Sequence, residues 1–317
     1  MTTALGRDMG AESARSAATT TITSRPPTGL VENARELWRY RALVRTLVER
    51  DLRVRYKNSV LGIAWTMVNP LVQVLVLTIA IGYILGSGPK NLSAYIFCAT
   101  LPWTFFQTAV LDSSSAVLVK LPLLKKVYFP REIPLIATVC QNFVQLGISL
   151  AVFVLYRWVV TPLLFGGLTW PPREIAWLPA LVVLLFLLTL GVSFFVCAAN
   201  VFYEDVKFIV SMGMTFLFYL LPIIYFPENI FFSARIPVRL HWWAYHLYLA
   251  NPLAWIITAF RQVFFAPAVI SSRGAPTVMS APFDLRYFAL AAMLSLGICL
   301  SGYSYFNGRK WKFTERP

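Results

Sequence analysis

The stretch IAWLPALVVLLFLLTLGVSFFVCAANVFY, residues 175–203, carries no Asp, Glu, Lys or Arg. A helix needs about 20 predominantly apolar residues to cross the hydrocarbon core of a bilayer, and this stretch exceeds that length. Uncharged stretches of at least this minimum length recur elsewhere in the chain, at 58–89, 91–111, 133–156, 208–227, 240–260 and 287–308. The sequence therefore predicts a helical protein that crosses a membrane several times.

The composition excludes the soluble class. Of the 317 residues, 58% are hydrophobic and 13% are charged, with a mean hydropathy of +0.64, whereas a soluble domain carries roughly a quarter of its residues as charges. The net charge of +14 could indicate nucleic-acid binding. The cations, however, lie in short clusters between uncharged stretches, which is the pattern of loops between membrane spans. No nucleic-acid partner is expected.

One of the seven stretches, 240–260, is a poor candidate for a span. It is rich in Trp and Tyr, which favour the boundary between membrane and water, and Asn251-Pro252 interrupts it. Proline removes a backbone donor and disfavours helix at the residue before it. We interpret this run as a broken, re-entrant or interfacial pair of short helices. The six remaining spans are expected at 61–86, 93–118, 133–157, 177–202, 206–226 and 286–307.

The distribution of cations sets the expected orientation. With six spans and a cytoplasmic N-terminus, the segments 1–57, 119–132, 203–207 and 309–317 face the cytoplasm and hold 20 of the 28 Lys and Arg residues. Cytoplasmic loops carry the excess of Lys and Arg in membrane proteins. A seventh span would move the cations of 309–317 outside, so both termini are predicted to be cytoplasmic.

Four segments follow from this reading. Residues 1–34 are rich in Thr, Ser, Ala and Arg and predict a disordered N-terminal tail. Residues 35–57 predict a basic amphipathic helix along the cytoplasmic membrane surface, with an apolar stripe of Leu37, Tyr40, Val44, Leu47 and Val48; a solvated helix without a partner is the alternative. Residues 58–308 form the transmembrane domain, and 309–317 a cytoplasmic C-terminal tail. The fold class is all-α and polytopic.

The chain lacks the usual chemistry of an ion-driven carrier, which needs ionisable groups inside the membrane. Asp112 comes closest, and a helix-end carboxylate in contact with water is its simplest interpretation. No phosphate-binding loop of the form G-x-x-x-x-G-K-[ST] occurs. His241 and His246 are five residues apart and cannot share a helix face as metal ligands. The chain is expected to bind no metal or cofactor and to draw its energy from another protein.

A polytopic enzyme acting on lipid-linked glycans, such as a glycosyl- or acyltransferase, is the alternative function. It would need acids or histidines aligned at a membrane boundary. The available groups are divided between the two sides of the membrane, and they are Asp112, Glu204, Asp205, His241 and His246. The sequence therefore favours a transporter subunit over an enzyme.

Several short strings of residues, taken in order, carry a family resemblance. They are 53–65 (RVRYKNSVLGIAW), 69–71 (NPL), 123–132 (LLKKVYFPRE), 200–206 (NVFYEDV), 251–253 (NPL) and 260–261 (FR). In this order the chain resembles, over residues 35–310, the membrane (permease) subunits of ATP-binding-cassette exporters for cell-surface polysaccharides and polyol phosphates. That ABC type-2 permease family exports O-antigen, capsule, teichoic acid and galactan. The chain departs from it at Glu204, where a basic residue is expected before Asp205.

The resemblance implies a homodimer that carries two copies of a separate nucleotide-binding ATPase on its cytoplasmic side. ATP and Mg would bind that partner, and this chain would be a non-enzymatic subunit of the bacterial inner membrane. The substrate would be a polymer, and the implied partners are membrane lipid and a lipid-linked polysaccharide. The resemblance also implies short periplasmic re-entrant helices between spans 5 and 6, in agreement with the interpretation of 240–260.

The family places the ATPase contact on the amphipathic helix and on the loop between spans two and three. The candidate coupling residues in this chain are Arg53, Arg55, Tyr56, Lys125, Lys126, Val127, Tyr128, Phe129, Pro130 and Arg131. An apolar, aromatic centre flanked by cations can insert into a groove while the cations bind its rim. A cationic turn placed only by the excess of cytoplasmic charge is the alternative.

Sugars present C–H faces that pack on aromatic rings, so a path lined by aromatic side chains suits a translocated polysaccharide. The candidates for this path are Trp65, Trp103, Phe105, Phe106, Phe216 and Tyr219, and the candidates for a periplasmic gate are Trp242, Trp243 and Tyr245. Aromatic belts at the bilayer boundary and ordinary helix packing account for the same residues equally well.

Overall fold

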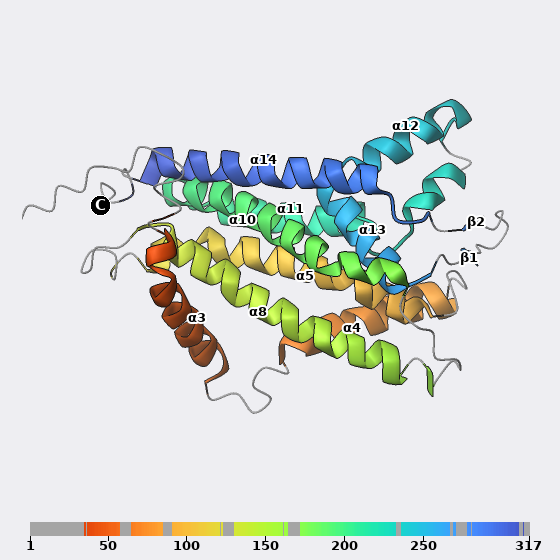
Figure 1. Cartoon of the computed structure of the whole chain (residues 1–317), viewed down its shortest axis with the longest axis horizontal. Coiled ribbons are helices and arrows are strands. Elements are labelled where there is room, and N and C mark those ends of the chain that lie inside the picture. The colour runs from red at the N-terminus through yellow and green to blue at the C-terminus, as the bar shows by residue number, and fades with distance from the viewer. Residues whose placement is uncertain are drawn as a thin grey trace, which may run out of the picture. The chain divides into compact units, whose positions relative to one another are not determined.

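The computed structural model describes residues 35, 37–57, 65–84, 91–120, 122, 130–160, 162–163, 172–232, 236–266, 269–270, 278–279, 281–310 and 313. The chain divides into two units, Met1–Arg41 and Ala42–Pro317. In the first unit, the guanidinium of Arg41 lies 5.6 Å from the ring centroid of Trp38. The second unit contains a bundle of helices (Figure 1). The tail predicted over 1–34 lies outside the described residues.

The elements follow one another as helices, with one short strand pair. The helices are α3 (Arg41–Tyr56), α4 (Trp65–Thr78), η2 (Ile79–Ile84), α5 (Leu92–Ser114), α6 (Ala116–Val119), α8 (Ile133–Leu155), η3 (Tyr156–Val160), η4 (Arg173–Trp177), α10 (Leu178–Phe202), α11 (Val206–Leu220), η5 (Pro227–Phe232), α12 (Val238–Leu249), α13 (Pro252–Phe264) and α14 (Leu285–Arg309). The strands β1 (Val269–Ile270) and β2 (Val278–Met279) pair antiparallel. The helical class is as predicted, apart from this strand pair.

Helix α5 is the centre of the bundle and packs against α4, α8, α10 and α13. Of its 23 residues, 17 are buried, whereas 17% of the residues are buried in the span Met67–Ile84 formed by α4 and η2. Its buried hydroxyls bond within the helix: Thr100 donates to the carbonyl of Ile96 at 2.8 Å, and Ser113 to that of Val110 at 3.1 Å. Because these groups are satisfied locally, the helix can be surrounded by apolar neighbours on all sides.

Helices α10 and α14 run side by side along their length (Figure 1). Their closest approach is at two glycines: a Cβ atom on Gly191 would lie 2.7 Å from the Cα of Cys299, and one on Gly302 would collide with the carbonyl oxygen of Gly191. Small residues allow transmembrane helices to approach closely and gain dispersion contacts. Beside this contact, Phe194 and Phe306 have ring centroids 5.3 Å apart.

Five helical segments among the described residues are long and apolar enough to cross a membrane. They are Met67–Ile84, Leu92–Ser114, Ile133–Val159, Arg173–Phe202 and Leu285–Arg309. They correspond to five of the six predicted spans, so the chain is a polytopic α-helical protein.

The remaining prediction, a span over 206–226, is too long. Helix α11 has 15 residues and ends at Leu220. Leu221 precedes Pro222 and is extended, with φ −81° and ψ 155°, because proline disfavours the helical region for the residue before it. A six-residue irregular segment then leads to η5.

The predicted break at Asn251-Pro252 is present. Helices α12 and α13 have 12 and 13 residues and meet at this point. The side chain of Asn251 accepts hydrogen bonds from the backbone N–H groups of Leu253 and Ala254, at 3.0 and 3.4 Å. Asn251 is therefore the N-cap of α13, with Pro252 at its first position, where the missing N–H costs nothing.

Candidate functional site

Helix α3 lies within the segment 35–57 and has an apolar and a charged face. Leu47 is buried, Val44 and Val48 are partly buried, and Arg45 is exposed. Its last two turns carry the polar residues that reach the bundle. This arrangement places charged side chains of α3 beside the C-terminal end of α5.

An ion pair joins α3 to the residue that follows α6. The Nζ of Lys120 lies 2.6 Å from Oδ2 of Asp51, and the two side chains are 9% and 18% exposed. A pair shielded to this degree is less screened than a surface pair, and loss of either partner leaves a charge without compensation. The pair fixes the beginning of the 121–131 connection, which we define as the residues between Lys120 and Glu132, to α3.

A second polar group joins α3, α5 and α8. Arg55 donates to Oδ2 of Asp112 at 2.6 Å and to Oε1 of Gln145 at 3.2 Å. Asn142 donates to the same oxygen of Asp112 at 3.1 Å. Asp112 is therefore an acceptor shared by a cation and an amide, not simply the water-exposed carboxylate that the sequence indicated.

The far end of the 121–131 connection is held by α14. The Nζ of Lys310 lies 2.7 Å from Oε1 of Glu132, with side-chain exposures of 9% and 2%. Arg131 also donates to the carbonyl oxygen of Lys310. The start of α8 and the end of α14 are thus joined by a buried ion pair, although they are 178 residues apart in the chain.

The neighbouring turn, between α10 and α11, is tied to the same end of α5. Asn200 donates to the carbonyl oxygen of Ser114 at 3.1 Å, and its Oδ1 accepts from the backbone N–H of Lys207 at 3.0 Å. Glu204 and Asp205 are exposed in this turn. One buried amide therefore connects three helices where the chain reverses direction.

Two of these ion pairs, Asp51–Lys120 and Arg55–Asp112, line a groove of about 670 Å³ at the C-terminal end of α5. It is lined by Arg50, Asp51, Val54, Arg55, Leu111, Asp112, Ser115, Ala116, Val119, Lys120, Pro122, Thr138 and Gln141. Each of the three carboxylates Asp51, Asp112 and Glu132 is engaged by a cation. A set of compensated charges holds helices in register, which suits the mechanical transmission of force better than proton transfer.

The predicted coupling residues fall into three groups in the structure. Lys125, Lys126, Val127, Tyr128 and Phe129 lie outside the described residues. Pro130 and Arg131 lie at the end of the connection, and Arg131 is anchored as described above. Of the α3 residues, Arg55 is engaged with Asp112, Arg53 is exposed, and Tyr56 is partly buried.

The predicted aromatic residues do not form one lining within this chain. Trp103, Phe105 and Phe106 are buried in the core, and the rings of Trp103 and Phe218 lie 6.0 Å apart. The other three path candidates are more than half exposed, and they are Trp65, Phe216 and Tyr219. Of the gate candidates, Trp242 and Trp243 are exposed and in edge contact, whereas Tyr245 is buried.

Six residues that tie the helices together at this end of the bundle were not predicted from the sequence. These are Asp51, Lys120, Glu132, Asn142, Asn200 and Lys310. Two of them had a usable signal, because Asn142 and Asn200 stand in otherwise apolar spans, where a buried amide requires partners. The ion pairs had none, since their partners are distant in sequence.

The bundle and its tied polar end define a multi-pass helical membrane protein of the transporter permease class. The chain belongs to the ABC-2 type transporter family, whose match covers residues 42–265. This match confirms the resemblance inferred from the sequence strings. The chain is therefore a membrane subunit of an ABC transporter.

Curated proteins named "O-antigen export system permease protein RfbA" are similar to this chain. The protein from Myxococcus xanthus is 29% identical over 287 residues, which cover 90% of this chain and 99% of the relative. Two proteins from Klebsiella pneumoniae are 25% and 23% identical over 274 residues, each covering 86% of this chain and 94% of the relative. These aligned lengths exceed that of the segment matched by the family, residues 42–265.

Proposed function

We propose that this chain is the transmembrane subunit of an exporter that moves a lipid-linked polysaccharide or polyol-phosphate polymer across the bacterial inner membrane. A separate ATPase subunit binds ATP and Mg and supplies the energy. The names of the relatives support the class of substrate. The observation that carries the mechanism is that ion pairs hold both ends of the 121–131 connection, Lys120 to α3 and Glu132 to α14.

The coupling step follows from these anchors. The ATPase contacts residues 125–131 together with Arg53, Arg55 and Tyr56 of α3. A displacement of the connection cannot be absorbed at its ends, because each end is joined by a shielded ion pair to a different helix. The displacement therefore moves α3 and α14 together with α5 and α8, and a nucleotide-driven motion becomes a motion of the bundle.

The proposed topology has six spans. Helix α11 is the short fifth span, and α12 and α13 form a re-entrant pair on the periplasmic side. The C-terminal end of α5, with its ion pairs, then faces the cytoplasm, as do both termini of the chain. Cations near the end of α14 favour the same orientation.

The functional unit is a homodimer that carries two ATPase subunits. Helix α11 supports this proposal with an apolar face that its own chain leaves exposed, formed by Phe208, Ile209, Met212, Phe216, Tyr219 and Leu220. A second copy would cover this face. The path for the polymer lies between the copies, where Trp65, Phe216 and Tyr219 provide aromatic surface, backed by Trp103, Phe105 and Phe106. Trp242, Trp243 and Tyr245 form its periplasmic gate.

Co-expression with a candidate ATPase subunit tests the proposal. We expect the two chains to purify together, and ATP hydrolysis in lipid nanodiscs to depend on both. A rate of ATP hydrolysis that is the same with and without this chain would contradict the proposal. Nucleotide hydrolysis by this chain alone would also contradict it.

A further inference from the structure

A polar cavity lies at the opposite end of α5 from the anchored connection. Tyr95 lines the cavity, and Asp112 lies 17 positions further along the same helix, a rise of about 25 Å. Figure 1 shows α12, α13 and the strands at this end of the bundle, away from the C-terminal end of α14. In the proposed orientation the cavity faces the periplasm.

The cavity comprises two adjoining chambers. The inner chamber has a volume of about 60 Å³ and is walled by α5, η4, η5 and α13. The outer chamber has a volume of about 510 Å³ and reaches Tyr245, His246 and Tyr287. Both chambers share the lining residues Thr258, Gln262, Ala281, Pro282 and Phe283. The shared lining shows that the two chambers adjoin.

Two oxygen atoms in this lining accept no hydrogen bond from any described residue. Glu228 is 5% exposed; its Oε1 accepts from the backbone N–H of Ala281 at 2.7 Å, and its Oε2 has no partner. Gln262 donates through Nε2 to the carbonyl oxygen of Ala281 at 2.9 Å, and its Oε1 has no partner. Because the amide nitrogen is fixed by a carbonyl, the free atom of Gln262 is the oxygen.

The two free oxygens are held on a common support. Glu228 binds the N–H of Ala281, and Gln262 binds its C=O, so residue 281 positions both side chains. A buried acceptor without a donor costs about 1–3 kcal/mol by general experience with hydrogen bonds. A ligand that brings two donors to this place would remove that cost.

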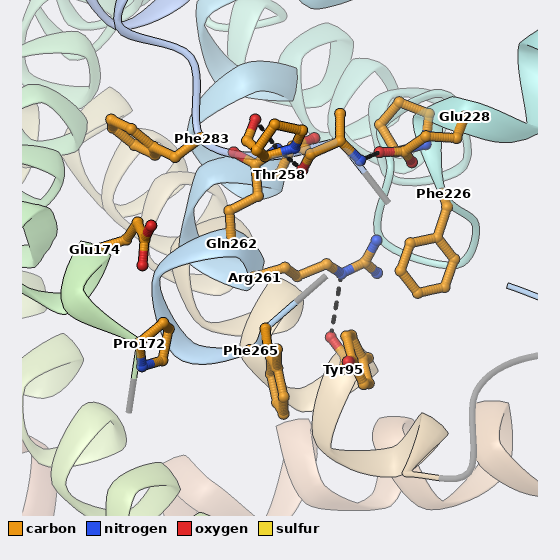
Figure 2. Close-up of a pocket in the computed structure, with 14 residues that line it drawn as sticks. Tyr95, Pro172, Glu174, Phe226, Glu228, Thr258, Arg261, Gln262, Phe265 and Phe283 are labelled. Atoms are coloured by element: carbon orange, nitrogen blue, oxygen red, sulfur yellow. Dashed lines mark hydrogen bonds between the residues drawn. The ribbon is translucent and has the colours of Figure 1, made fainter. Parts of the chain in front are cut away.

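Arg261 makes the surrounding wall rigid without competing for the free oxygens. Its guanidinium donates to the carbonyl oxygens of Tyr95, Tyr225 and Ile223, at 3.3, 3.0 and 2.6 Å. It also lies 4.8 Å from the ring centroid of Phe226, as the close-up in Figure 2 shows. All three of its nitrogen atoms are thereby engaged, and its charge disfavours a metal cation in the chamber.

Aromatic side chains form part of the remaining lining. Tyr95 and Phe265 are stacked with centroids 4.0 Å apart, and Phe283 packs against Trp255 at 5.6 Å. Aromatic faces accept the C–H faces of sugar rings, whereas the two oxygens accept hydroxyl donors. The outer chamber is large enough for a sugar ring, and the inner chamber for its hydroxyl groups.

From this geometry we infer that the cavity is a saccharide-binding site, which takes a neutral, hydroxyl-rich sugar unit through Glu228 and Gln262. The site lies within one subunit and is separate from the path between subunits. It deepens the proposed export of a saccharide polymer and rests on that function for its biological role. A site here would hold an emerging sugar unit on the outer side and oppose backward sliding of the polymer.

Direct binding to the full-length protein in nanodiscs, without the ATPase, tests the inference. The probes are the methyl glycosides of galactose, mannose, rhamnose and N-acetylglucosamine, detected by saturation-transfer NMR and by the fluorescence of Trp255 and its neighbours. We expect at least one probe to bind. Glu228→Gln retains the bond to Ala281 and should weaken binding about tenfold, because a charge-assisted acceptor is lost.

Gln262→Met removes the second acceptor and should weaken binding about three- to tenfold. Gln107→Met, in the middle of α5 and outside the cavity lining, is the matched control and should bind like the unmodified protein. The size-exclusion profile and unfolding temperature of each variant show whether it is folded. If Gln262→Met does not fold, Glu228→Gln alone decides, because it preserves shape.

The outcomes separate this inference from the proposed function. Absence of binding by every probe, or binding that both variants leave unchanged, overturns the saccharide site while ATPase dependence on this chain stands. Preferential binding of tetramethylammonium or calcium over the glycosides also overturns it. If glycoside binding depends on Glu228 and Gln262 but ATP hydrolysis does not depend on this chain, the saccharide site is supported and the proposed exporter function is contradicted.

Discussion

Gly191 of α10 lies so close to Cys299 of α14 that a Cβ atom on the glycine would be 2.7 Å from the Cα of the cysteine. That neighbour is backbone, which cannot rotate away as a flexible side chain can. The two helices therefore touch main chain to main chain. Within a membrane, where apolar surface gains nothing from leaving lipid for protein, such close packing is a principal source of helix association.

Gly191→Ala should destabilise the protein by about 1–3 kcal/mol, the usual cost of inserting a methylene-sized group into a packed site. Thermal unfolding in detergent measures the change. Gly297→Ala is the control on α14, since a Cβ atom there meets nothing within 4 Å, and it should be neutral or slightly stabilising. Equal effects of the two variants would show that the helices are not in close contact.

Reversing the charge of either Asp51 or Lys120 should uncouple transport from ATP hydrolysis, because each single change places two like charges where an ion pair of 2.6 Å stands in the unmodified protein. The double exchange, Asp51→Lys with Lys120→Asp, should recover a large part of export. Export by intact cells and ATPase stimulation in nanodiscs are the measurements. The control is Glu49→Ala, which breaks the ion pair between Arg45 and Glu49, whose side chains are 83% and 47% exposed. This change should alter the free energy of unfolding by less than about 0.5 kcal/mol. Failure of the double exchange to restore function would argue against the pair as an anchor.

The joint replacement Tyr128→Ala and Phe129→Ala should reduce export and ATPase stimulation at least tenfold, since aromatic anchors commonly supply most of the binding energy of a small interface. Insertion and folding should be unchanged. Tyr83→Ala, at an aromatic residue that is 82% exposed and lies at the end of η2, is the control and should preserve export. Normal ATPase stimulation by the double variant would remove these residues from the coupling contact.

The fold was largely predictable because membrane spans can be recognised by the length of their uncharged, apolar stretches. Residues 175–203 and four other stretches became long helices since lipid offers no partner for an unpaired backbone group. The same rule overestimated the span over 206–226. The apolar sequence continues past Leu220, but the helix ends there because Pro222 disfavours the helical conformation of Leu221. Hydropathy does not detect this local effect.

The candidate site was predictable only in part. The amphipathic pattern and the family resemblance pointed to α3, but they did not predict that its Arg55 pairs with Asp112 of α5. The pair of Glu132 with Lys310 joins residues 178 positions apart. Either residue read alone is an ordinary charge at the end of a span, so the pairing depends on how the helices pack.

Glu228 gives a pH dependence to stability. Burial raises the pKa of its carboxyl group, although the N–H of Ala281 and the charge of Arg261 oppose the shift. The folded protein therefore holds this proton more tightly than the unfolded chain, and stability falls as the pH rises from the ordinary carboxyl range through the raised pKa.

Glu228→Gln removes this titration and should raise the unfolding temperature relative to the unmodified protein as the pH rises from about 4 to about 8. At the acidic end the two proteins should unfold at similar temperatures. Glu174→Gln, at an exposed carboxylate of the same cavity, should change the unfolding temperature little throughout. A constant difference for Glu228→Gln across the range would mean that the carboxyl group does not titrate as inferred.

Burial of Arg261 also orders the biogenesis of the protein. The carbonyl oxygens that receive its guanidinium belong to α5 and to the irregular segment after α11, both of which are synthesised earlier. An uncompensated guanidinium is costly in hydrocarbon, so α13 is stable at its final depth only after these acceptors have come together. Helix α13, which is synthesised later, must therefore dock onto a partly assembled bundle. A variant that delays the packing of α5 against the segment after α11 would leave α13 exposed to quality-control proteases.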